Sequence, residues 1–90
     1  MSQAIVDPDE LERFAKSLKQ FDSDLASRMS HLRGQFAQLG STWRDQQHVR
    51  FAQDFQQTMT ALDRFIREAE AHIPVLMRQV ADVRRYQGRG

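Results

Sequence analysis

The 90-residue sequence contains no cysteine. Disulfide bonds, thiolate catalysis and cysteine-based zinc sites are therefore excluded. Histidine supplies no metal site either, because His31, His48 and His72 lie on different stretches and no HExxH or paired Glu-x-x-His motif occurs. Glycine-rich phosphate loops and nucleophile elbows are also absent. We expect a protein that is not an enzyme and that binds neither a metal nor another cofactor.

Long hydrophobic runs and an excess of one charge are missing as well. No window approaches the roughly 20 apolar residues of a membrane-spanning helix. The N-terminal sequence MSQAIVDPDE lacks the basic and apolar regions of a classical signal peptide. Lysine and arginine total 13 against 12 acidic residues, far from the basic balance that nucleic-acid binding usually requires. We expect a soluble protein that neither inserts stably into membranes nor binds nucleic acid.

Proline and glycine are scarce, and the common residues favour helix nearly everywhere. The sequence DPDE at residues 7–10 is typical of a helix start, with Asp7 as the N-cap, Pro8 in the first turn and Glu10 at capping-box spacing. Gly40 stands where a left-handed C-terminal cap belongs. These signals predict a first helix over residues 8–39. Leucines recur along it every seven residues, at Leu11, Leu18, Leu25, Leu32 and Leu39.

A second helix is predicted over about residues 43–85. Ser41 or Thr42 can cap its start, and Thr42 to Asp45 has capping-box spacing. Two seven-residue apolar series follow, namely Ala52, Met59, Ile66, Ile73 and Val80, and Phe55, Leu62, Ala69, Leu76 and Val83. The series keep their phase across Pro74, which predicts a kink near residues 70–74. The alternative is a break followed by a short third helix.

The short connection between the two helices predicts an all-α fold, an antiparallel two-helix hairpin that forms one domain over residues 1–90. Residues 1–6 and 86–90 lack the periodicity and are expected to fray. The exposed faces carry acidic and basic residues four apart, at Glu12 and Lys16, Asp24 and Arg28, and Asp63 and Arg67. Basic residues gather near the C-terminus, where we expect them to complement the dipole of the second helix. An anion-binding tail is a less favoured interpretation. The tail residues are Arg84, Arg85, Tyr86 and Arg89.

Two helices enclose only a seam, and the apolar surface of this chain is wider than that. Phe51, Thr58, Phe65 and His72 form a third column beside the second helix's two series. In the first helix, the apolar residues beside the leucines change side halfway along, which indicates that its two halves face different neighbours. Leaving several aromatic side chains in water forgoes several kcal/mol. We therefore predict dimerisation into a four-helix bundle through Phe14, Phe21, Met29, Phe36, Phe51 and Phe65.

The stretch GSTWRDQQHVRF, residues 40–51, holds the only tryptophan, and we expect Trp43 to cover the open end of the seam. With its length, two long helices and central tryptophan turn, the chain resembles the WXG family, the early-secreted-antigen-like substrates of bacterial type VII secretion. Trp43 matches the tryptophan of the Trp-x-Gly turn motif, and Phe51 matches the aromatic residue that commonly follows eight positions later. Asp45 stands in place of the motif's glycine.

The resemblance implies a noncatalytic hairpin that forms homodimers or heterodimers and engages a secretion ATPase or a larger effector. We expect a secretion substrate or co-substrate that resides in the cytoplasm before export and leaves without a classical signal peptide. The family's usual Tyr-x-x-x-Asp/Glu export signal is incomplete, because Gly90 stands four residues after Tyr86. Two alternatives follow: the chain travels with a partner that carries the signal, or it is an intracellular adaptor or chaperone hairpin that binds a helical segment of an effector or toxin.

Overall fold

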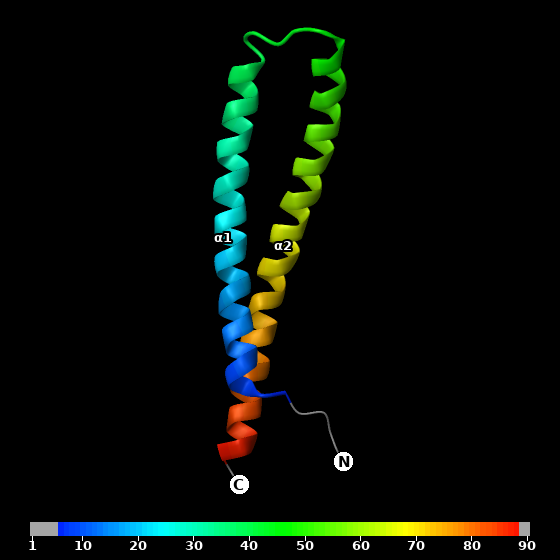
Figure 1. Cartoon of the computed structure of the whole chain (residues 1–90). Helices are drawn as coiled ribbons and strands as arrows, with labels where there is room; N and C mark the ends of the chain where they lie inside the picture. The colour runs from blue at the N-terminus through cyan, green and yellow to red at the C-terminus, as the bar shows by residue number, and fades with distance from the viewer. Residues whose placement is uncertain (1–5, 89–90) are drawn as a thin grey trace.

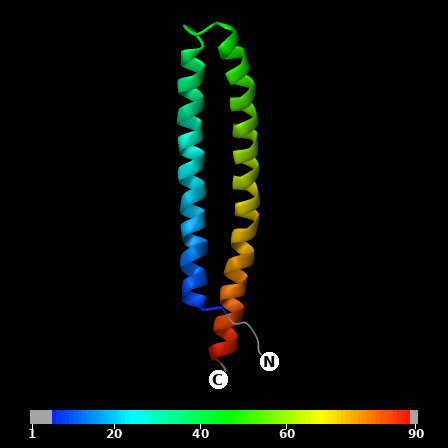
Figure 2. The ribbon, with the colours of Figure 1, turned by 45° about the vertical axis from the view of Figure 1, so that its right-hand side comes forward.

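The computed structural model describes residues 6–88, which form two α-helices joined by one turn. Helix α1 spans Pro8–Leu39 and helix α2 spans Gln46–Gly88. They lie side by side and antiparallel, so that the turn is at one end and both chain ends are at the other (Figures 1 and 2). The hairpin measures 67 × 22 × 15 Å. The prediction of an all-α hairpin is confirmed.

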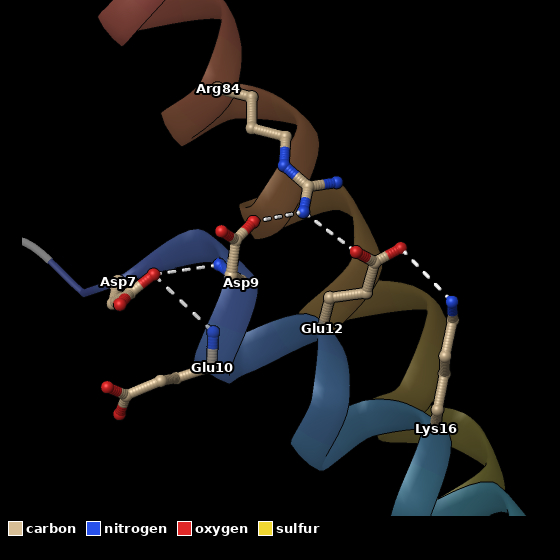
Figure 3. A network of polar contacts seen from close by, with 6 residues as sticks. All are labelled: Asp7, Asp9, Glu10, Glu12, Lys16 and Arg84. Atoms are coloured by element: carbon tan, nitrogen blue, oxygen red, sulfur yellow. Dashed lines mark hydrogen bonds and ion pairs between the residues drawn. The ribbon is translucent and has the colours of Figure 1, made fainter.

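Asp7 caps α1 as predicted. Its Oδ1 atom accepts hydrogen bonds from the backbone N–H groups of Asp9 at 2.9 Å and Glu10 at 3.5 Å. Pro8 follows in the first turn, where its missing N–H costs no helix hydrogen bond. No contact joins the Glu10 carboxylate to Asp7 (Figure 3). Glu10 thus contributes a backbone donor to the cap, and the cap is one-sided rather than a reciprocal capping box.

The turn differs from the sequence prediction at the end of α1. Gly40 has φ −62° and ψ −16°, which is right-handed backbone, so the predicted left-handed cap is wrong. Ser41 Oγ donates to the carbonyl of Gln38 at 2.8 Å, and Thr42 Oγ1 donates to the carbonyl of Leu39 at 3.2 Å. Both hydroxyls therefore satisfy the last carbonyls of α1 instead of starting α2. The correction has a simple cause: a hydroxyl between two helices can serve either one.

Helix α2 begins three residues later than predicted because Asp45 is its N-cap. Its Oδ1 accepts from the backbone N–H of His48 at 3.1 Å, the usual geometry of a capping side chain. At the other end α2 reaches Gly88. Residues 86–88, expected to fray, are therefore helical. The other expected tail residues, 1–5 and 89–90, lie outside the described residues.

Helix α2 passes through Pro74 without interruption, so the alternative of a short third helix is wrong. The ribbon of α2 is curved along its length (Figures 1 and 2). A proline inside a helix removes one backbone hydrogen bond and pushes against the preceding turn, which favours bending. Ile73 and Leu76, on either side of Pro74, are both half-buried. The apolar seam of α2 therefore continues past the proline.

The seam between the helices is built by the two predicted heptad series of α2. Every residue of both series is buried or half-buried, which confirms this prediction. The facing side of α1 presents a different column, Ala15, Asp22, Met29 and Phe36, beside the first three leucines. The tightest cluster joins Met29 to Met59 and Ile66, with Leu25, Phe55 and Leu62 packed around it. The last two leucines of the predicted line, Leu32 and Leu39, are exposed.

A charged network fastens the open end of the hairpin. Arg84 near the end of α2 reaches back to α1, where one guanidinium nitrogen lies 2.8 Å from Asp9 Oδ1 and 2.7 Å from Glu12 Oε1 (Figure 3). Glu12 also pairs with Lys16 at 3.5 Å, as predicted. The hydrogen bond from Arg84 and the nearby positive charges of Arg84 and Lys16 hold the pKa of Glu12 below its ordinary value. The network joins helix ends that are far apart in the sequence.

The other two predicted helix-surface pairs are replaced by different contacts. Asp63 pairs with Arg33 of α1 at 2.8 Å rather than with Arg67. Asp24 accepts a hydrogen bond from Gln20 Nε2 at 2.9 Å rather than from Arg28. A partner on the opposite helix competes with the partner four residues away, and sequence spacing does not reveal it.

Candidate interaction surface

An aromatic cluster closes the turn end of the hairpin. Phe36 lies at its centre, stacked on His48 at a centroid distance of 5.3 Å and packed against Phe51 at 5.6 Å and Phe55 at 4.7 Å. Trp43 approaches His48 edge-on at 5.1 Å and Phe51 at 6.1 Å. Rings at these separations attract one another beyond the simple burial of their area. The cluster joins the end of α1, the turn and the first three turns of α2.

Trp43 is held in this cluster by its backbone as well as by its ring. Its N–H donates to the carbonyl of Leu39 at 2.9 Å, which continues the end of α1 into the turn. The side chain is half-buried. The ring therefore packs over the end of the seam, as the sequence predicts, and keeps part of its surface open to solvent.

A groove with almost entirely apolar walls runs from this cluster along the hairpin. Its volume is about 410 Å³. Both helices contribute to the walls, which consist of Leu32, Gln35, Phe36, Leu39, Phe51, Asp54, Phe55, Thr58 and Met59. Apolar concavities of this size are typical of surfaces that receive another molecule.

Four phenylalanines extend the apolar surface along the molecule. Phe14, Phe21, Phe51 and Phe65 are between 42% and 58% exposed. Phe21 of α1 meets Phe65 of α2 edge-to-face at 6.1 Å, so the two helices share one continuous surface. Together with the exposed Leu32 and Leu39, these phenylalanines make up what we call the aromatic face. Large exposed apolar surfaces are typical of proteins that bind a partner.

The predicted interface set divides in two. Phe14, Phe21, Phe51 and Phe65 lie on the aromatic face, whereas Met29 is buried in the hairpin's own seam. The placement of Met29 at an interface with a second hairpin is therefore corrected. Phe36 is half-buried in the cluster at the turn and contributes one edge of the groove. The change of side halfway along the first helix, read from the sequence, is the reason for this division.

The basic C-terminal segment is engaged within the chain. Arg84 holds Asp9 and Glu12, and Arg85 pairs with Asp82. Tyr86 is exposed on the last described turn of α2. The two arginines that can be described are thus committed to acidic partners, which weakens the interpretation of this segment as an anion-binding tail.

Two acidic residues have roles that go beyond the main sequence predictions. The spacing favours Ser41 or Thr42 as the cap of α2, whereas Asp45, in the glycine position of the motif, is the cap. No sequence motif singles out Asp22, yet it is buried in the seam. Its signal was available, because Asp22 falls exactly one heptad from Ala15 and Met29.

Within residues 6–88 there is no group of three or more histidine or acidic side chains placed to hold a metal ion. Over the same range neither helix has the length and apolarity needed to cross a membrane.

Comparison with known proteins agrees with this architecture. Residues 3–86 match the WXG100 family, described as proteins of 100 residues with WXG. No curated protein matches the sequence. The structure is similar to crystal structures of the secreted protein EsxB from Bacillus anthracis str. Sterne. A glycine-to-alanine variant of EsxB is 26% identical with a TM-score of 0.75, and the match covers 93% of this chain and 97% of that one.

The selenomethionine-labelled form of EsxB gives the same result. It is 25% identical with a TM-score of 0.75, and the match covers 97% of this chain and 99% of that one. The family match spans both helices and the tryptophan turn, with Asp45 in the place of the motif's glycine. The chain therefore belongs to the WXG100 family.

Proposed function

We propose that this protein is a type VII secretion substrate or co-substrate that acts without catalysis, by pairing with a second hairpin through its aromatic face. The single observation that carries the proposal is the exposure of Phe14, Phe21, Phe51 and Phe65 on one side of the molecule. A homologous hairpin laid along that side would complete a four-helix bundle.

The energetics favour such pairing. An aromatic side chain buries roughly 150–250 Å² when fully enclosed. With about half of that area still exposed on each of these phenylalanines, covering them at about 25 cal/mol per Å² contributes several kcal/mol on each partner. The groove beside the turn would receive side chains of the partner in the same step. Because both helices line this groove, pairing would also hold the hairpin together.

Family membership and the likeness to EsxB support the secretion role. EsxB is described as a secreted protein, and it matches this chain over nearly its whole length. We infer that this chain is made in the cytoplasm and exported without a classical signal peptide, alone or with the hairpin it pairs with. A secretion ATPase or a larger effector would then be a further partner.

Phe21→Lys tests the pairing. We expect the wild-type chain at micromolar concentration to sediment at twice its 10.5 kDa mass, and the variant to sediment as a folded monomer. Gln57→Lys is the matched control, because it adds the same charge at an exposed site of α2 away from the aromatic face. A wild-type chain that remains a stable monomer, or a variant that pairs as well as wild type, would contradict the proposal.

Export is tested in the native host. The chain should appear in the culture supernatant only while the secretion ATPase is intact, and Phe21→Lys should reduce its export if pairing precedes secretion. Retention of the wild-type chain inside the cell, bound to a helical segment of an effector, would instead favour the adaptor function.

A further inference from the structure

The side of the hairpin opposite the aromatic face contains a second cleft. Successive residues of a helix are separated by about 100° around its axis, so Phe21 and Ser23 point to nearly opposite sides of α1. The cleft lies on the Ser23 side. It has a volume of about 450 Å³, and its walls include Lys19, Asp22, Ser23, Glu70, Ile73 and Pro74.

Asp22 is the unusual residue of this cleft. Its side chain is only 3% exposed, and neither carboxylate oxygen has a hydrogen-bond partner among residues 6–88. Burying a carboxylate without a partner is unfavourable, and Ala15 and Met29, one heptad away on either side, show what the seam accommodates there. The stability of the single hairpin therefore does not account for Asp22.

A further acceptor borders the cleft on α2. Pro74 has no backbone N–H, so the carbonyl of Glu70 lacks the donor that an α-helix normally provides four residues later. Glu70 also lines the cleft. The lining residues thus include two carboxylates, Asp22 and Glu70, against one lysine, and the site suits the cationic head of a further lysine or arginine side chain.

We propose that a second copy of this chain docks across this side and inserts its Lys19 side chain into the cleft beside Asp22, with the reciprocal contact formed at the same time. Lys19 and Asp22 line the same cleft but form no ion pair with each other. If two α1 helices cross antiparallel about a two-fold axis at the level of residues 20 and 21, each Lys19 lies at the level of the other copy's Asp22. A two-fold contact requires this kind of self-complementary surface.

The neighbouring surface of α1 permits close approach of such a helix. Small exposed residues recur along this flank at helical spacing, and an added Cβ at Gly34 would meet nothing within 4 Å. They are Ser23, Ala26, Ser30, Gly34 and Ala37. Since the aromatic face is on the other side, this contact is compatible with pairing through that face and would join two such pairs.

A charge-exchange experiment tests the contact. Lys19→Asp and Asp22→Lys are each expected to weaken this self-association by about tenfold or more, because like charges then meet across the two-fold axis. Mixing the two variants should restore it, since every cross-chain pair is again opposite in charge. Arg64→Asp and Glu68→Lys are the matched controls, with the same charge changes at exposed sites of α2. The readout is sedimentation velocity over a range of concentrations.

Two further variants keep the test decisive. Lys19→Asp alters an exposed residue, so its association can be measured even if Asp22→Lys does not fold, and Lys19→Arg should associate like wild type. In a Phe21→Lys background, the polar contact should appear as a monomer–dimer equilibrium above the micromolar range in which that variant is monomeric, which separates its failure from failure of the aromatic face. Wild-type association by Lys19→Asp, or an equal loss of association in Arg64→Asp and Glu68→Lys, would overturn the proposal.

Discussion

The Oδ1 atom of Asp45 accepts a hydrogen bond from the backbone N–H of His48 at 3.1 Å, and this bond begins α2. Asp45 stands where the family motif has glycine. A glycine at an N-cap leaves the helix N–H groups to water, whereas the aspartate satisfies one of them and places a negative charge at the positive end of the helix dipole. The departure from the motif is thus compatible with the same turn.

Asp45→Ala should lower the free energy of unfolding by about 1 kcal/mol, because the N–H of His48 loses its acceptor. Asp45→Gly, which restores the family residue, should cost only a few tenths of a kcal/mol relative to wild type. Urea unfolding followed by far-UV circular dichroism measures both. An alanine variant as stable as wild type would show that the cap contributes nothing.

Gly40→Ala should leave the hairpin folded and raise its stability by about 0.5 kcal/mol, since alanine loses less backbone entropy on folding. Gly40 has right-handed backbone angles, and the added Cβ would lie 3.4 Å from the Ala37 carbonyl oxygen and 3.6 Å from His48 Nε2, both ordinary contacts. Thermal unfolding checks this. A marked loss of stability would instead indicate the left-handed cap expected from the sequence.

Trp43→Ala should lower the free energy of unfolding by about 2 kcal/mol, less than for a fully buried tryptophan because the ring is half-buried. The lost contacts are those with His48 and Phe51. Circular dichroism is the appropriate probe, since the variant has no tryptophan fluorescence. Tyr86→Ala, at an exposed aromatic residue, is the control and should change stability by less than about 0.5 kcal/mol. Equal stability of both variants would assign Trp43 to recognition alone.

Acid should weaken the fastening at the open end. The pKa of Glu12 is held below its ordinary value of 4.5, first by the hydrogen bond from Arg84 and then by the nearby positive charges. A carboxyl with a lowered pKa in the folded state stabilises that state above its unfolded pKa, and this stabilisation is lost as the pH falls through the folded pKa. Unfolding free energies measured from pH 6 down to about pH 3 should therefore decline less steeply in Glu12→Gln.

The control for this pH series is Glu10→Gln. Glu10 belongs to the same first turn, but its side chain points away from the network in Figure 3. The glutamine at position 10 should leave the Glu12 contribution in place. If the Glu12 variant follows the wild-type pH profile over this range, the Arg84 contact does not stabilise the folded chain in solution.

Asp22→Leu should stabilise the isolated hairpin by about 1–3 kcal/mol at neutral pH, because it removes an unpartnered buried carboxylate and supplies an apolar side chain to the seam. Asp24→Leu is the control, since Asp24 is exposed and its carboxylate is bonded to Gln20. Urea unfolding at a concentration below self-association compares the two. A destabilised Asp22→Leu hairpin would mean that the carboxylate has a stabilising partner in solution.

Periodicity predicted the parts of this fold that depend on many residues at once. The two heptad series of α2 predicted which side of this helix faces α1. Each additional heptad indicated the same side, including those beyond Pro74. The start of α1 was also predictable, because Asp7 and Pro8 serve only one helix. Local signals that could belong to either helix gave wrong predictions. Ser41 and Thr42 can cap the end of α1 or the start of α2, and the path of the turn decides which hydrogen bonds they form.

The interface was less predictable than the fold for a related reason. Phe14 and Met29 are both apolar residues beside the leucine line, but the seam takes only those that point directly at α2. The crossing of the two helices decides this, and no single-helix pattern contains it. Asp63 illustrates the same limit, since Arg33 and Arg67 were both within reach and the contact across the hairpin formed.

The elongated shape has a practical consequence for every measurement of assembly. The radius of gyration is 20.0 Å. A compact domain of this chain length would have about 12 Å. A rod of this kind diffuses slowly for its mass, so the monomer would leave a gel-filtration column at the volume of a much larger globular protein. Retention volume therefore depends on the length of this hairpin as well as on the number of chains. Light scattering or sedimentation equilibrium is needed to count the chains.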